Sequence, residues 1–115
     1  MQETFNSIIE WHKETFPEAT LEGQLAKYDE EEKEFGRAFY NEKESLMELA
    51  DMIIVACGIM RFDFRLGLKY LVATIYTLGI SPWDSKELWD AVERKMEINH
   101  NRVWDKTEEG SYHHV

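Results

Sequence analysis

The most apolar helical segment of the chain carries acidic residues on its inward-facing stripe, and this combination restricts the possible folds. Between about residues 42 and 64, one stripe recurs at alternating spacings of four and three residues: Glu44, Glu48, Asp51, Val55, Gly58 and Phe62. That spacing is typical of a seam packed against another helix. The acidic members therefore stand where apolar side chains are expected, and burying them costs free energy unless a partner compensates their charge.

A second acidic pair precedes this stripe. Glu31 and Glu34 are spaced i, i+3, as are Glu48 and Asp51, so each pair lies on one helical face. Helix propensity weakens between the pairs and then recovers, which predicts an antiparallel hairpin that reverses near Asn41. The four carboxylates would then converge and repel one another unless a divalent cation neutralised them. Oxygen ligands alone favour Mg²⁺, or Mn²⁺, over zinc.

An acidic run such as residues 29–34 is also typical of a solvated helix face. The inward position of the second pair favours the metal site over that alternative.

Two helices are expected before Asn41. The first spans residues 3–15 and ends before Pro17, with Trp11 beside its apolar stripe of Phe5, Ile8, Ile9 and His12. The second starts at a cap on Thr20 and runs to about Phe39. Its buried side is expected to be Leu21, Leu25, Tyr28, Phe35 and Phe39. The adjacent stripe carries Gln24, Lys27, Glu31 and Glu34.

Two more helices are expected after the central one. A loop at residues 65–67 leads into a helix that ends at a C-cap on Gly79 and in which Leu68, Leu71, Val72 and Ile75 recur at helical spacing. Ser81 is expected to cap the last helix, with Pro82 in its first turn and Asp84 as the acid of a capping box. With no strand-like alternation, the fold class is all-α, a bundle of four or five helices.

The last helix becomes cationic halfway along its inward stripe, which reads Leu88, Val92, Lys95, Asn99 and Arg102. Buried cations need an anionic partner. Lys95, Asn99 and Arg102 either pair with the acids of the hairpin in a salt-bridge network or hold a phosphate chain beside a metal bound there. Two cationic side chains and an amide on one stripe favour the second alternative, a polyanionic ligand such as a phosphate chain.

Length and charge limit the function classes. The 115 residues form one domain, with residues 103–115 as a C-terminal tail. A formal net charge of −10 argues against binding to nucleic acid or to anionic membranes. We see no membrane span and no signal peptide, and expect a cytoplasmic protein. The single cysteine, Cys57, lies in an apolar run and is expected in the core.

These residues match a known pattern. Glu30-Glu31-x-x-Glu34, followed after thirteen residues by Glu48-x-x-Asp51, resembles the EExxE…ExxD signature of the MazG-like, all-α nucleoside triphosphate pyrophosphatases. Relatives of that family include dimeric dUTPases and dCTP pyrophosphatases. Lys95, Asn99 and Arg102 are similar to the K…N..R that follows in such proteins, and the resemblance spans roughly residues 11–115.

The resemblance implies Mg²⁺-dependent hydrolysis of a (deoxy)nucleoside triphosphate to the monophosphate and pyrophosphate, with nucleotide-pool cleansing as the usual role. Four carboxylates would hold the metal: Glu31, Glu34, Glu48 and Asp51. Lys95, Asn99 and Arg102 would hold the phosphates, and Glu34 is our choice of general base. Trp11, Gln24 and Lys27 are placed to contact base or sugar. A homodimer or homotetramer is implied.

Two rival readings remain. A di-iron bundle needs a Glu-x-x-His motif on two helices, and the chain has only Glu97-x-x-His100. The alternative that stays open is a non-enzymatic acidic bundle that binds a partner protein or holds a structural metal.

Overall fold

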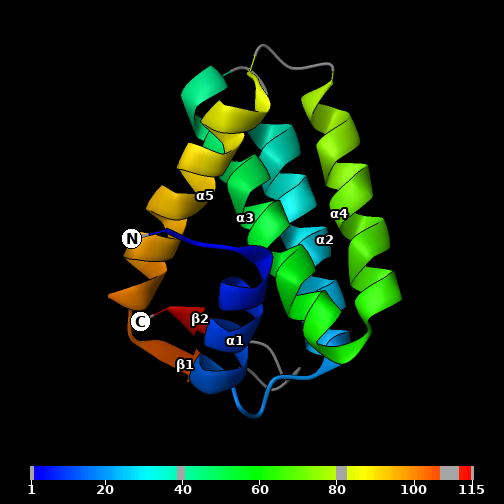
Figure 1. Ribbon diagram of the computed structural model, residues 1–115, viewed down its shortest axis with the longest axis vertical. Coiled ribbons are helices and arrows are strands. Elements are labelled where there is room, and N and C mark those ends of the chain that lie inside the picture. The colour runs from blue at the N-terminus through cyan, green and yellow to red at the C-terminus, as the bar shows by residue number, and fades with distance from the viewer. Residues whose placement is uncertain (1, 39–40, 80–82, 107–111, 115) are drawn as a thin grey trace.

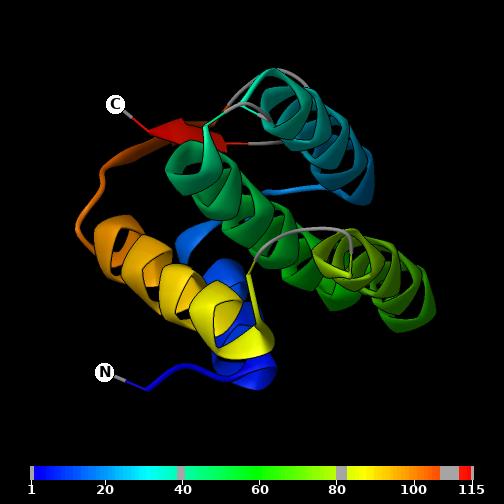
Figure 2. The same cartoon turned by 90° about the horizontal axis from the view of Figure 1, so that it is seen from above.

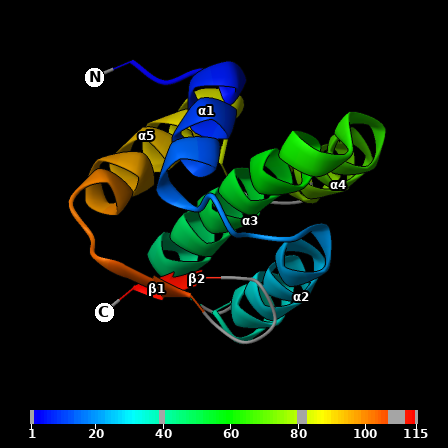
Figure 3. The ribbon, with the colours of Figure 1, turned by 90° about the horizontal axis from the view of Figure 1, so that it is seen from below.

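Helix α3 (Glu42–Phe62) lies at the centre of the molecule and packs against four other helices. A computed structural model describes residues 2–38, 41–79, 83–106 and 112–114. The other elements are α1 (Phe5–Thr15), α2 (Leu21–Arg37), α4 (Phe64–Leu78), α5 (Ser85–His100), β1 (Trp104–Lys106) and β2 (Tyr112–His114). Figures 1, 2 and 3 show α3 surrounded by the other helices, so the all-α bundle expected from the sequence is confirmed.

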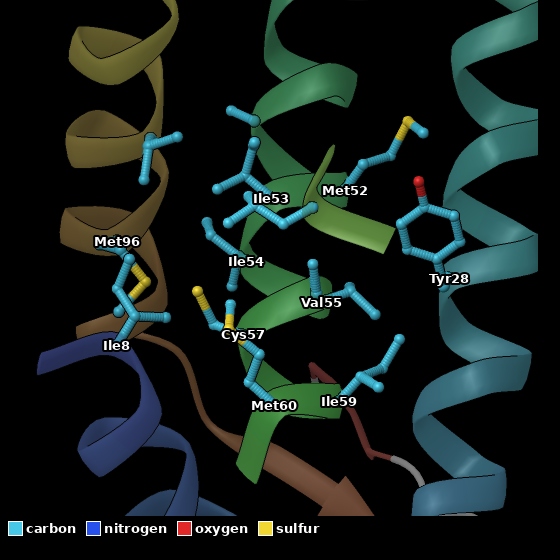
Figure 4. Packing of buried hydrophobic residues seen from close by; sticks show 14 of the residues in the cluster. Ile8, Tyr28, Met52, Ile53, Ile54, Val55, Cys57, Ile59, Met60 and Met96 are labelled. Atoms are coloured by element: carbon cyan, nitrogen blue, oxygen red, sulfur yellow. The ribbon is translucent and has the colours of Figure 1, made fainter. Parts of the chain in front are cut away.

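The core forms around α3 because this helix is apolar on several sides, as the sequence predicted. Ala50, Met52 and the whole run from residue 53 to 60 are buried. Figure 4 shows side chains of α3 packing toward Ile8 of α1 and Met96 of α5 on one side, and toward Tyr28 of α2 on the other. Tyr28 also joins α2 to α4, because its hydroxyl lies 2.7 Å from Thr74 Oγ1.

Polar side chains cap each helix start and fix where the helices begin. The caps are Thr4, Thr20, Asn41, Asp63 and Asp84, and each accepts a hydrogen bond from the backbone N–H three residues later. The predicted cap at Thr20 is therefore confirmed, and α3 begins next to Asn41, where the reversal was predicted. Phe39 and the predicted features at Ser81 and Pro82 lie outside the described residues. Asp84 is the N-cap itself, not the capping-box acid that we expected, because Glu87 takes that position.

The connection between α3 and α4 differs from the prediction. We expected a loop at residues 65–67, but Asp63 alone separates the two helices and Gly67 lies inside α4. A Cβ at Gly67 would overlap the backbone of Met60, so this glycine allows the two helices to approach closely and does not break α4. The sharp reversal sends α4 back along α3.

Part of the C-terminal tail forms a hairpin, which the sequence pattern did not predict. β1 and β2 pair in antiparallel register, with Trp104 opposite His114 and Lys106 opposite Tyr112. The hairpin brings Trp104 against the end of α1, where its ring packs edge-on against Phe16 and Trp11.

The outer side of α4 is apolar and exposed. Of the helical repeat Leu68, Leu71, Val72 and Ile75, only Leu71 is buried. The other three are between 42% and 47% exposed, because within the described residues α4 packs extensively on α3 alone. Among the described residues, no helix combines the length and the apolar character that crossing a bilayer requires.

Candidate functional site

Three of the four predicted carboxylates meet in the structure. Glu31 of α2 and Glu48 and Asp51 of α3 each offer an oxygen atom within 4.8 Å of the others. The antiparallel packing of α2 on α3 produces this arrangement, since the i, i+3 spacing puts Glu48 and Asp51 on the face of α3 that α2 covers. We call these three residues the acidic cluster.

Glu34, the fourth predicted carboxylate, lies outside the acidic cluster. Its side chain is 45% exposed and makes an ion pair with Arg37, 3.3 Å away and one turn along α2. Its charge still contributes to raising the pKa of Glu48, so the two carboxylates are near enough to interact across the hairpin. Glu34 therefore borders the acidic cluster on its solvent side.

Two lysines neutralise part of the acidic cluster. Lys95 Nζ of α5 lies 3.1 Å from Asp51 Oδ2, and Lys27 Nζ of α2 lies 3.5 Å from Glu31 Oε1. The Lys95 and Asp51 side chains are 15% and 21% exposed, so water screens this pair less than it screens a surface pair. This is the first of the two arrangements considered for Lys95, in which it pairs with the hairpin acids.

The lysines do not fully compensate the crowded acids. Burial, followed by the charge of Asp51, raises the pKa of Glu31 to about 8. Burial and the charge of Asp51 also raise the pKa of Glu48, and burial raises that of Asp51 despite Lys95. The side chains of Glu31 and Glu48 hydrogen bond to each other, which requires a shared proton. A site that holds a proton at neutral pH is a site where a cation would replace that proton.

A cavity of about 130 Å³ opens beside the acidic cluster. Trp11, Gln24 and Lys27, the three residues proposed for the base or sugar, all line it, together with Glu31 and Asp51. The remaining lining residues are His12, Phe16, Ile54, Val55, Asn99 and Trp104. One side of the cavity is thus charged and the other is aromatic.

The aromatic wall of the cavity consists of Trp11, Phe16 and Trp104. The Trp11 and Phe16 ring centroids are 5.2 Å apart, and those of Phe16 and Trp104 are 5.0 Å apart, all in edge-to-face contacts. Edge-to-face packing fixes the rings relative to one another. A cavity lined by aromatic rings suits a flat, apolar or aromatic ligand group.

Asn99 and Arg102 continue the cationic stripe beyond Lys95. Asn99 is buried and lines the cavity, and its side-chain oxygen accepts a hydrogen bond from Arg102 at 3.4 Å. The Arg102 guanidinium also lies 5.8 Å from the Trp104 ring centre. Of these three residues, Asn99 lines the cavity, Lys95 contacts Asp51, and Arg102 follows the end of α5.

His12 is a cavity residue that we counted only as a member of the apolar stripe of α1. It is 4% exposed, lines the cavity and hydrogen bonds to Gln24. Burial, and next the charge of Arg61, lower the pKa of His12 to about 4. The sequence signal for this role was weak, because a polar residue on an otherwise apolar stripe is the only sign of it.

Cys57 is fully buried among apolar side chains, and burial raises the pKa of its thiol to about 12. The thiol is therefore protonated and inert at neutral pH, in agreement with the core position predicted for it.

The fold and the site together define an all-α bundle with an acidic cluster and a cationic stripe at the edge of an aromatic cavity. Comparisons with protein-family models, with curated proteins and with solved structures give no match to this chain.

Proposed function

We propose that the protein is a Mg²⁺-dependent nucleoside triphosphate pyrophosphohydrolase that releases pyrophosphate from a (deoxy)nucleoside triphosphate. The observation that carries this proposal is the position of the acidic cluster, with Lys95 against it, at the edge of an aromatic cavity. A triphosphate needs a cation and basic groups, and a base needs a flat pocket. The EExxE…ExxD spacing, which resembles that of the MazG-like pyrophosphatases, supports the same activity.

The acidic cluster fits a hard divalent cation. Glu31, Glu48 and Asp51 supply only oxygen ligands, and their raised pKa values reflect a charge repulsion that a cation would relieve. Glu34 is the fourth proposed metal ligand. To bind the metal, its side chain would leave its exposed ion pair with Arg37. Bound Mg²⁺ supplies Lewis-acid polarisation of a phosphoryl oxygen.

The cationic stripe is proposed to hold the leaving phosphates. Lys95 and Arg102 neutralise the β and γ phosphates, while the Asn99 amide orients them by hydrogen bonding. Lys95 is already within 3.1 Å of Asp51, so only a small movement of its long side chain would bring it between the acidic cluster and an incoming phosphate. Holding the phosphates in line with an attacking water is the main contribution that a protein makes in this chemistry.

Glu34 is proposed to take the proton from the attacking water. Its side chain is partly exposed and borders the acidic cluster, so it has access both to solvent and to the reacting phosphate. In contrast, Asp51 is committed to Lys95 and Glu31 to Lys27. A carboxylate without a buried cationic partner is the better acceptor of a proton in this setting.

The second candidate is a non-enzymatic helical module that binds a protein partner or holds a structural metal. The ion pairs from Lys95 to Asp51 and from Lys27 to Glu31 favour it, because they show that the chain neutralises part of its own acidic cluster. Such pairs stabilise a bundle without any ligand.

The deciding experiment measures pyrophosphate release from a panel of canonical and modified ribo- and deoxynucleoside triphosphates with Mg²⁺. We expect turnover by the unmodified protein and a loss of at least 100-fold in Glu48→Gln, the size of effect expected when a group at the reacting centre is removed. Glu44→Gln is the matched control, because Glu44 lies one turn earlier on α3 and is exposed. If the unmodified protein turns over no nucleotide, the module is the better account.

We also propose that the protein is a homo-oligomer that pairs through α4. Phe64, Leu68, Val72 and Tyr76 follow one another at spacings of four residues on the exposed side of α4, with Ile75 beside them. Contiguous exposed apolar residues of this kind are typical of association surfaces.

A further inference from the structure

The ring of His12 has a defined tautomer, because Arg61 contacts one of its nitrogens. Arg61 Nη1 lies 3.1 Å from His12 Nδ1 and donates a second bond to the Phe16 carbonyl at 2.7 Å. A guanidinium only donates hydrogen bonds, so Nδ1 must accept. With the neutral ring favoured by burial, the proton of His12 is on Nε2.

That proton determines how Gln24 is oriented. His12 Nε2 and Gln24 Oε1 meet over the backbone of Gly58, where a Cβ would lie 2.9 Å from the first atom and 2.6 Å from the second. The two side chains hydrogen bond, and since Nε2 donates, the Gln24 oxygen accepts. The group of Gln24 that remains for a cavity ligand is its NH₂, which is a donor only.

The size of the cavity matches a single ring. A space of roughly 150 Å³ accommodates one benzene molecule. The cavity of about 130 Å³ between Gln24 and the aromatic wall therefore suits one six-membered ring, and a fused pair would extend beyond it.

The polarity of the cavity orients such a ring. Since the sugar and phosphates must extend toward the acidic cluster, the edge of the base opposite the sugar enters the cavity first. In a pyrimidine, the atom opposite the sugar-bearing nitrogen is carbon 4. Gln24 is 5% exposed and lies away from solvent, so it meets the substituent at this position.

We propose that Arg61 and His12 are positioning residues that fix the Gln24 amide as a donor, so that the cavity selects a pyrimidine with a carbonyl at carbon 4, of the uracil or thymine type. This inference rests on the proposed function for the identity of the ligand. A 4-amino pyrimidine of the cytosine type presents its own donors to the Gln24 NH₂, and two donors facing each other in a buried site are unfavourable.

The tautomer is tested without any nucleotide. We expect ¹⁵N-edited spectra of the imidazole to show His12 in the Nε2–H form at neutral pH. In Arg61→Met the fixed acceptor contact is lost, and the spectra should report a mixture of the two tautomers. An Nδ1–H form in the unmodified protein would overturn the proposal.

The selectivity is tested by comparing dUTP and dTTP with dCTP, both for hydrolysis and for equilibrium binding of the monophosphates. We expect the unmodified protein to favour the 4-oxo compounds by about 10- to 100-fold, the range that a buried donor without an acceptor produces. His12→Phe should lose most of this preference through KM, with little change in kcat. His12→Gln, which keeps a donor for Gln24, should restore it. Gln24→Glu should reverse the preference, because it offers an acceptor.

The outcomes separate this inference from the proposed function. If the protein hydrolyses nucleotides without preferring the 4-oxo group, or prefers dCTP, the inferred selectivity is wrong. The proposed pyrophosphohydrolase activity is then unaffected. Selective binding of the 4-oxo monophosphates without hydrolysis of any triphosphate supports the inferred selectivity and contradicts the proposed enzymatic activity. Failure to bind any pyrimidine monophosphate overturns the inference, whatever the enzyme hydrolyses. The measurements on the unmodified protein decide these cases even if a variant does not fold.

Discussion

Lys95 Nζ lies 3.1 Å from Asp51 Oδ2 and joins the last helix of the bundle to the central one. This contact links the phosphate-binding stripe to the acidic cluster, and the two candidate functions assign different roles to it. In the enzyme, Lys95 turns from Asp51 to the substrate. In the module, the pair is permanent.

Replacing Lys95 by methionine tests these roles. The variant leaves Asp51 without its closest cation in a poorly solvated place, so we expect the free energy of unfolding to fall by about 1–3 kcal/mol. We also expect kcat/KM for a triphosphate to fall by at least about 10-fold. Urea unfolding and steady-state kinetics measure the two effects.

Lys86→Met is the control for this variant, because Lys86 pairs with Asp90 on the same helix in an exposed position. It should leave stability and turnover close to those of the unmodified protein. If Lys95→Met and Lys86→Met have equal effects, the contact of Lys95 with Asp51 contributes no more than an exposed ion pair.

The acidic cluster should bind Mg²⁺ or Mn²⁺ more tightly as the pH rises. Because the pKa of Glu31 is raised to about 8, a proton must leave before a cation enters, and the affinity should increase by about 10-fold for each pH unit between roughly pH 6 and pH 8. Titration calorimetry across that range measures the slope. Glu31→Gln should remove it, whereas Glu30→Gln, on the exposed side of α2, should not. If the pH dependence of the affinity is unchanged in Glu31→Gln, the cation does not bind at the acidic cluster.

The same carboxyl group makes the metal-free protein less stable at higher pH. Folding raises the pKa of Glu31 from 4.5 to about 8, so between these values the folded state keeps a proton that the unfolded state has lost. The contribution of Glu31 to the free energy of unfolding is therefore greatest below pH 4.5 and declines as the pH rises toward 8. Thermal unfolding in a chelator should show this decline, and Mg²⁺ should reverse it.

His12 has the opposite effect on stability. Folding lowers its pKa from 6.5 to about 4, so in this range the unfolded state binds a proton that the folded state excludes. The contribution of neutral His12 to the free energy of unfolding is fully present above pH 6.5. It is lost as the pH falls toward 4, which lowers the free energy of unfolding by up to about 3 kcal/mol. His12→Gln should flatten this part of the stability curve in urea unfolding. An identical loss in both proteins would show that other groups cause it.

Two glycines provide a matched pair of alanine substitutions. Gly58→Ala puts a methyl group 2.6 Å from Gln24 Oε1 and 2.9 Å from His12 Nε2, so we expect a destabilisation of about 1–3 kcal/mol. Gly36→Ala meets nothing within 4 Å inside a helix, so we expect it to stabilise the protein by roughly 0.5–1 kcal/mol. Chemical denaturation measures both, and effects of the same sign would contradict the close approach at Gly58.

The exposed face of α4 predicts the oligomeric state. Tyr76 is 78% exposed, and a charge there should disrupt an interface formed by α4 without disturbing the core. We therefore expect light scattering to report an oligomer for the unmodified chain and a monomer for Tyr76→Glu. Lys86→Glu on α5 serves as the control and should remain an oligomer. A monomeric unmodified protein would contradict pairing through α4.

Local patterns in the sequence were sufficient to predict the hairpin and its acids. The spacing of Glu31, Glu48 and Asp51 depends only on helix geometry and on a reversal near Asn41, and the structure brings these three together. The end of α3 was harder to predict. Gly67 looked like a helix breaker, and only the packing of α4 on Met60 explains a glycine inside that helix.

The role of His12 depended on contacts between distant segments. Its hydrogen bonds to Arg61 and Gln24 exist because α1, α2 and α3 approach one another at Gly58. Helical periodicity describes one segment at a time and carries no information on such a meeting. The pairing of β1 with β2 was missed for a related reason, because strands of three residues are too short to show alternation.

The order of the site residues along the chain has a consequence for how the protein acquires its structure. The acids come from neighbouring helices, whose hairpin has short-range contacts and needs no later segment to form. Lys95, Arg102 and Trp104 are synthesised only after this hairpin. A growing chain thus forms the hairpin, in which Lys27 can already pair with Glu31, before Lys95 is available to pair with Asp51. Docking of α5 is the step that makes the site complete.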